Sequence, residues 1–136
     1  MEKKMKHMEM IQAVITRMAS NSFALKGWAV TLVAALFALS GKDANPTYFL
    51  VAYIPVLVFW YLDAFYLMQE RLYRNLYEKV RQQSEDEIDF SMNAAADEFK
   101  TEKTTISNCF LSKTILGFYL PLALVTAGII LITYIF

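Results

Sequence analysis

The chain has 136 residues, 57% of them hydrophobic, and its 13 basic side chains balance 13 acidic ones. A soluble domain of this length could hardly hide so much apolar surface in one core, and the zero net charge gives no indication of a nucleic acid partner. A single cysteine, Cys109, excludes an intrachain disulfide, and with one histidine, His7, the spacing of a zinc site is missing. We therefore expect an all-α membrane protein in the lipid bilayer, with no metal and no other cofactor.

The first 22 residues predict a cytoplasmic amphipathic helix. Within residues 3–19, five apolar side chains recur at helical spacing: Met8, Ile11, Val14, Ile15 and Met18. The "SNS" at 20–22 offers side chains suited to an N-cap, which favours a break or bend before the apolar sequence begins.

Three apolar segments follow, at 23–40, 47–68 and 114–136. Each is close to the roughly 20 residues that a helix needs to cross the hydrocarbon layer. The "ALS" before Gly41 resembles a signal-peptide cleavage site, but the helical segment ahead of it is much longer than a basic n-region. We expect all three segments to be retained as transmembrane helices.

The distribution of basic residues predicts the orientation. The "GKDANPT" at 41–47 is rich in turn residues, so the first two spans should form an antiparallel hairpin. Five Lys and Arg residues lie in 1–26, seven in 69–113, and only Lys42 at the hairpin tip. Basic loops stay in the cytoplasm, so we expect a multi-pass protein of a bacterial inner membrane with a cytoplasmic N-terminus and an external C-terminus.

Residues 69–113 should form a cytoplasmic helix and loop. The stretch "QERLYRNLYEKVRQQ" has no Gly or Pro, so the second transmembrane helix should continue through it, with the stripe Leu72, Leu76 and Val80 facing the N-terminal helix. Residues 84–108 are polar and read as an ordered loop, in which "SMNAAADEF" at 91–99 favours a short helix.

Two charged residues interrupt the apolar segments. Lys26 lies eighteen residues before Ala44 at the hairpin tip, and Asp63 lies nineteen after it. Two antiparallel helices of equal rise would place both at nearly the same depth, where we expect an ion pair. The pair could fix the hairpin register or take part in gating. In a third alternative, each side chain reaches separately to the headgroups.

The first span also carries a face of small residues, Gly27, Thr31, Ala35 and Ala38. Small side chains allow the close helix contacts on which association in a bilayer depends. The sequence leaves open whether this face packs within the hairpin or between subunits.

Other residues of the spans predict local features. Pro55 in the second span and Pro121 in the third, with Gly117 and Gly128 nearby, favour kinks. Six aromatic residues lie near the ends of spans, as in an aromatic belt: Trp28, Tyr48, Trp60, Tyr61, Tyr66 and Tyr134.

No catalytic constellation is present in the sequence. It lacks a histidine beside a candidate nucleophile and a glycine-rich phosphate loop, so we do not expect an enzyme. The acidic run in the loop lacks the spacing of an EF-hand and reads as solvated. Charged and aromatic side chains near the second span form the candidate surface for a cytoplasmic partner or trigger: Arg71, Tyr73, Arg74, Tyr77, Glu85, Asp86, Glu87 and Asp89.

Two stretches, "RMASNSFALKGWAVTLVAALFAL" and "FWYLDAFYLMQERLYRNLYEKV", resemble the small prokaryotic membrane proteins of the SLATT and RipA-like octameric type. In those families an amphipathic helix leads through an Asn-Ser step, here Asn21-Ser22, into a transmembrane hairpin with a charged cytoplasmic extension. The resemblance covers about residues 8–82, and the third span departs from it. It implies a pore-forming effector of antiphage defence that responds to a neighbouring sensor or signalling protein.

Two functions are therefore expected to compete. The first is a homo-oligomeric pore-forming or membrane-disrupting effector of a bacterial antiphage or stress-response system, triggered through its cytoplasmic helices. The alternative is a non-conducting membrane anchor or scaffold that recruits a soluble partner protein.

Overall fold

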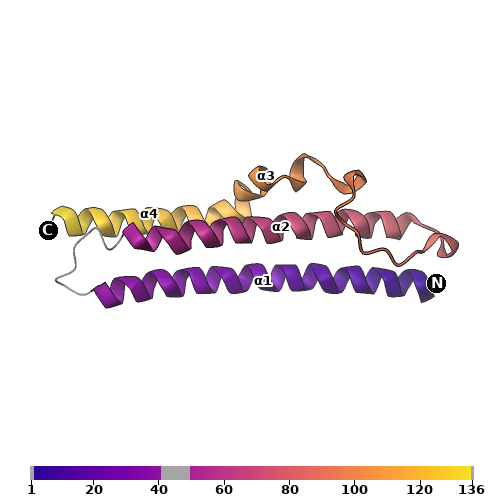
Figure 1. The fold of residues 1–136 in the computed structure, drawn as a ribbon, viewed down its shortest axis with the longest axis horizontal. Helices are drawn as coiled ribbons and strands as arrows, with labels where there is room; N and C mark the ends of the chain where they lie inside the picture. The colour runs from indigo at the N-terminus through magenta and orange to yellow at the C-terminus, as the bar shows by residue number, and fades with distance from the viewer. Residues whose placement is uncertain (1, 41–49, 136) are drawn as a thin grey trace.

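The computed structural model describes residues 2–40 and 50–135, which are helical with irregular connections and contain no strand. Three long helices run side by side: α1 (Glu2–Ser40), α2 (Tyr53–Gln82) and α4 (Lys113–Ile135). Helix α2 is antiparallel to both α1 and α4 and lies between them in Figure 1. The predicted turn at 41–47 and the first residues of the predicted second span, 47–49, lie outside the described residues.

Helix α1 is continuous through the "SNS" step, so the predicted break before the first span is wrong. The side chain of Ser22 does not cap a helix but donates a hydrogen bond to Asp63 of α2. The boundary between residues 1–22 and 23–40 is therefore a change of composition within one helix. At 1.5 Å per residue, α1 is about 58 Å long, roughly twice the thickness of a hydrocarbon layer.

Helix α2 continues beyond its apolar part to Gln82, as the sequence predicts. The kink expected at Pro55 is wrong, because this residue lies in the first turn of the helix. A proline there interrupts no internal hydrogen bond, since the first backbone amides of a helix have no acceptor within it. Pro121, in contrast, lies inside α4.

A first hydrophobic cluster joins the polar halves of α1 and α2. Ile11 and Ile15 of α1 are buried against the predicted stripe of α2, so the expected pairing of these two helices is confirmed. The cluster is completed by side chains from α2 and from the segment that follows it: Leu72, Leu76, Val80, Ala94 and Phe99. The two helices therefore remain packed together well beyond their apolar halves.

The segment after α2 folds back along the bundle in short turns. It contains the 3-10 turns η2 (Glu85–Glu87), η3 (Asp97–Phe99) and η4 (Glu102–Thr104), and then the short helix α3 (Ile106–Phe110). From the end of α2 it passes beside α1 and crosses α2 to the opposite side (Figure 1).

The helix predicted at 91–99 is wrong, since only its last three residues form a helical turn. The side chains of Asp89, Ser91 and Asn93 accept hydrogen bonds from backbone amides two residues further on. Such local bonds compete with helical ones, and they outweigh the helix propensity of the three alanines at 94–96.

A second hydrophobic cluster attaches α4 to α2. The Trp60 ring stacks on Phe110 at a centroid distance of 4.5 Å and on Tyr119 at 5.9 Å. Its indole nitrogen donates a 2.9 Å hydrogen bond to the Phe110 carbonyl. Trp60 is therefore an interior residue, and its assignment to an aromatic belt is wrong. Trp28 and Tyr61 are exposed.

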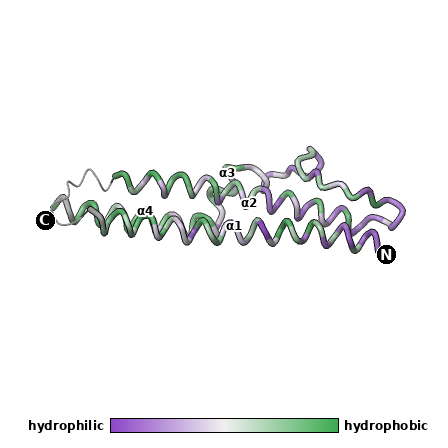
Figure 2. Tube along the Cα trace, turned by 60° about the horizontal axis from the view of Figure 1, so that its bottom comes forward, coloured by the Kyte–Doolittle hydropathy of each residue, from purple (hydrophilic) through white to green (hydrophobic). Residues whose placement is uncertain are grey.

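Polar and apolar residues separate along the bundle axis. Figure 2 shows hydrophilic residues gathered at the end where α1 begins, with hydrophobic ones dominating the other end. Three helices of the described chain are long and apolar enough to cross a membrane, within Glu2–Ala38, Leu50–Gln82 and Lys113–Ile132. The described chain is thus compatible with a multi-pass membrane protein.

Candidate functional site: a buried polar cluster between three helices

The two charged residues of the apolar segments are in contact. Lys26 Nζ of α1 lies 2.6 Å from Asp63 Oδ2 of α2. The Asp63 side chain is completely buried, and that of Lys26 is 18% exposed. The antiparallel packing of α1 and α2 therefore brings the predicted partners to one depth, and separate snorkelling does not describe this arrangement.

Ser22 completes the cluster, one helical turn before Lys26. Its hydroxyl donates to Asp63 Oδ1 and accepts a 2.8 Å hydrogen bond from Lys26 Nζ. Both oxygens of the buried carboxylate thus have a donor. The sequence reading missed this residue, although its four-residue spacing from Lys26 places both side chains on one face of a helix.

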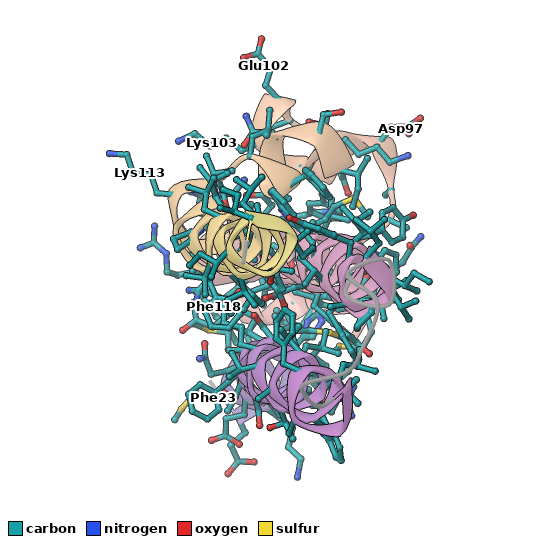
Figure 3. All side chains as sticks on the ribbon, turned by 90° about the vertical axis from the view of Figure 1, so that its left-hand side faces the viewer. Phe23, Asp97, Glu102, Lys103, Lys113 and Phe118 are labelled. Carbon is teal, nitrogen blue, oxygen red and sulfur yellow. The ribbon has the colours of Figure 1, made fainter. Side chains whose placement is uncertain are left out.

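Helix α4 closes the cluster from a third side. The Tyr119 hydroxyl is buried close enough to Asp63 for an electrostatic interaction, but it makes no hydrogen bond of good geometry within the described chain. Phe118 lies between α4 and α1 in Figure 3, and its ring centroid is 6.0 Å from Lys26 Nζ. Aromatic side chains therefore separate the charges from the surroundings.

This arrangement suits a structural clamp better than an ion pathway within one chain. A buried charge that loses its partner is far more costly than the intact pair is stabilising, so the pair defines how α1 and α2 align. Because the Asp63 carboxylate is enclosed by Ser22, Lys26 and Tyr119, it is not exposed to a water-filled path in the single chain. Among the described residues, no three His, Cys, Asp or Glu side chains converge as metal ligands would.

The small-residue face of α1 points away from the other two helices. Gly27, Thr31, Ala35 and Ala38 are all exposed, while Ala29 and Val33 on the opposite side are buried. A side chain at Gly27 would meet nothing within 4 Å beyond the backbone of its own helix and its chain neighbours. The alternative in which this face packs within the hairpin is thus not the one observed.

The residues predicted as a trigger surface do not form one surface. Arg71 is bound to the segment after α2, because it donates to the Lys103 carbonyl at 2.7 Å and to Asn108 Oδ1 at 2.9 Å. Tyr73 and Tyr77 are half-buried against the first hydrophobic cluster. The exposed members of the predicted set are Arg74, Asp86, Glu87 and Asp89.

Glu85 has a structural role that the interpretation of a solvated acidic run overlooked. Its carboxylate accepts hydrogen bonds from the backbone amides of Lys3 at 2.8 Å and Lys4 at 3.2 Å. These amides belong to the first turn of α1, where no carbonyl of the helix is available to them. The carboxylate also interacts favourably with the positive end of the helix dipole.

The fold and the buried cluster together define a helical protein with a polar end and three helices apolar enough to cross a membrane. Comparisons of the chain with models of protein families, with curated proteins and with solved structures found no match.

Proposed function

We propose that this chain is a three-span membrane protein that assembles into a homo-oligomeric pore in a bacterial inner membrane. In this proposal it acts as a membrane-disrupting effector of an antiphage or stress-response system, and its cytoplasmic helices receive the trigger from a sensor or signalling protein. Its resemblance to SLATT and RipA-like proteins over residues 8–82 supports this class of function.

One observation carries the proposal: the small-residue face of α1 is exposed on the outside of the bundle. Beside it lies a shallow hollow of about 270 Å³, lined by Ala24, Gly27, Trp28 and Thr31. The Thr31 hydroxyl bonds to its own helix at the Gly27 carbonyl, so it presents no unsatisfied donor to an apolar neighbour. A helix of a second copy can approach closely here, as small residues allow in bilayers.

A pore requires several copies, because three helices cannot enclose a water-filled path. The residues that would line the pore must therefore come from faces that are exposed in one copy. Lys26 and Asp63 are paired inside each chain, so in this proposal they hold each hairpin together and do not conduct ions.

The alternative function is a non-conducting anchor or scaffold, and a second hollow favours it. This hollow, of about 680 Å³, lies beside α3 and is lined mostly by polar side chains, including Arg71, Asn108 and Lys113. Polar hollows of this kind suit a soluble partner protein that is held at the membrane.

Gly27→Leu tests the pore. Expressed with its trigger, the wild type should form an oligomer and collapse the membrane potential. We expect the variant to do neither, because a leucine keeps a second helix at a distance. Native mass measurement in detergent and a fluorescent potential reporter in cells give the two readouts.

The matched control is Gly117→Leu, since Gly117 is equally open but lies on α4. We expect this variant to retain assembly and leak. A monomeric wild type, or an oligomer that leaves the potential intact under full triggering, would contradict the pore and favour the anchor.

A further inference from the structure

A polar cavity of about 190 Å³ lies against the first turns of α1, whereas the buried ion pair lies further along that helix, at Lys26. Its walls come from α1, from the end of α2 and from the segment after α2. The polar residues that line it are His7, Lys79, Gln83, Asp89, Ser91, Asn93 and Glu98. No part of the proposed pore requires this cavity, and a ligand could bind there in a pore or in an anchor.

Two buried hydrogen-bond acceptors of these walls lack a partner within the described chain. His7 is completely buried, and its Nε2 lies 2.7 Å from the Ser91 carbonyl oxygen. A carbonyl only accepts, so Nε2 carries a proton, and Nδ1 is an acceptor in the tautomer whose one proton is on Nε2. Nδ1 has no partner, and neither does the buried Oε1 of Gln83. Buried polar atoms of a native protein are usually satisfied, so both acceptors require a donor from outside the described chain, either water or a ligand.

The charges around the cavity indicate the sign of the ligand's charge. Lys79 is paired with Glu98 at 2.8 Å, which neutralises both. The second carboxylate is Asp89. The hydrogen bond from the Ser91 backbone amide, and to a smaller extent His7 and Lys79 nearby, lower the pKa of its carboxyl group, so it is ionised at neutral pH. The cavity therefore combines two acceptors with one excess negative charge. Among the described residues that line it, no three His, Cys, Asp or Glu side chains gather as metal ligands would.

We propose that this cavity binds a small organic cation rich in N–H donors, of the guanidinium or amine class. Its donors would bond to His7 Nδ1 and Gln83 Oε1, and its charge would face Asp89. A bound cation would hold the segment after α2 against α1, because His7 belongs to α1 and Asp89 to that segment.

His7 provides a direct test, because it is the chain's one histidine and gives a single set of ring resonances. The full chain with ¹⁵N-labelled histidine, in detergent micelles, is titrated with methylguanidinium. We expect the Nδ1 resonance to move upfield in a saturable way while Nε2 stays protonated. Methylurea has a similar shape without the charge, and we expect it to bind at least tenfold more weakly.

Two variants locate the effect. Asp89→Asn should weaken methylguanidinium binding by roughly tenfold, the effect of losing one charge-assisted hydrogen bond, whereas Gln83→Glu keeps the side-chain shape, adds charge and should tighten binding. Asp86→Asn is the matched control, because Asp86 is exposed and does not line the cavity. It should bind like the wild type.

Three outcomes would overturn the proposal. The first is an Nδ1 resonance that does not respond to millimolar methylguanidinium, which would mean that water alone occupies the cavity. The second is equal binding of methylurea. The third is equal weakening by Asp89→Asn and Asp86→Asn, which would indicate nonspecific attraction to the acidic segment.

Discussion

At the scale of single residues, the most consequential is Asp63, a fully buried carboxylate in an apolar sequence. Its two oxygens have separate donors, Lys26 Nζ and the Ser22 hydroxyl, both on one face of α1. Burial makes each donor matter more, because a carboxylate without water depends on the protein for all its hydrogen bonds. The three side chains therefore act as one unit.

Lys26→Met should destabilise the bundle by about 3–5 kcal/mol, because it leaves the Asp63 charge buried without its cation. Adding Asp63→Asn should recover most of that loss, since no charge then remains to be paired. Unfolding in mixed detergent micelles measures all four members of the double-mutant cycle. Strict additivity of the two changes would show that the two residues do not interact.

At the scale of elements, the ends of the helices are held by distant parts of the chain. The first turn of α1 is capped by Glu85, which follows α2, and α3 is tied to α2 by Arg71. The middle of each helix depends on its own composition, whereas these ends depend on tertiary contacts. Losing one of these tertiary contacts should therefore affect only the helix end that it holds.

Glu85→Ala should fray the start of α1, as the loss of other helix caps does. Hydrogen exchange at the Lys3 and Lys4 amides is the direct measurement, and it should accelerate. Glu87→Ala is the matched control, because the Glu87 side chain is exposed and accepts from Ser84. If both variants exchange alike at these amides, Glu85 is not the cap.

Cys109 of α3 reports on how α3 is docked. Burial raises the pKa of its thiol, so little thiolate is present at neutral pH, and Arg71 Nη1 lies 3.5 Å from its sulfur. The rate of Cys109 alkylation should be low in the wild type at neutral pH. It should still rise with pH in the range where the alkylation rate of an exposed thiol no longer changes.

Arg71→Gln should increase the rate of Cys109 alkylation several-fold, because it removes the bonds that hold the 103–109 segment on α2. Arg74→Gln is the control, since Arg74 is exposed and pairs with Glu70 on its own helix. Equal alkylation rates in the two variants would mean that Arg71 does not hold α3 in place.

At the scale of the whole molecule, twelve of thirteen basic residues lie in 1–26 and 69–113, toward one end of the apolar segments. In Figure 2 the hydrophilic residues gather at that end of the bundle. Helices α1 and α2 extend well into the polar end, so a membrane would enclose only the other part of the molecule. In the proposed topology the end that is rich in basic residues faces the cytoplasm.

Reporter fusions test that topology. Alkaline phosphatase fused at the C-terminus should be active, and the same reporter fused after Gln83 should be inactive, because only the external side allows this enzyme to fold. A cytoplasmic reporter should give the reverse pattern. Phosphatase activity after Gln83 would show that the orientation is inverted.

The sequence by itself determined the three apolar helices, the extension of α2 to Gln82 and the pairing of Lys26 with Asp63. These follow from local composition and from the constant rise of a helix, which converts residue number into depth. It was wrong about the break at 20–22, the kink at Pro55 and the helix at 91–99. At these positions local propensity did not show which hydrogen bonds the polar side chains make or where the helix containing Pro55 begins.

Only the tertiary structure decided where individual side chains point around each helix axis. It placed Ser22 on Asp63 and turned Trp60 inward onto Phe110 and Tyr119. It also left Gly27 and its neighbours on the outside. The physical reason is that the helices are apolar on nearly every side, so hydrophobic periodicity does not define a buried face. Packing and the need to satisfy one buried carboxylate define it instead.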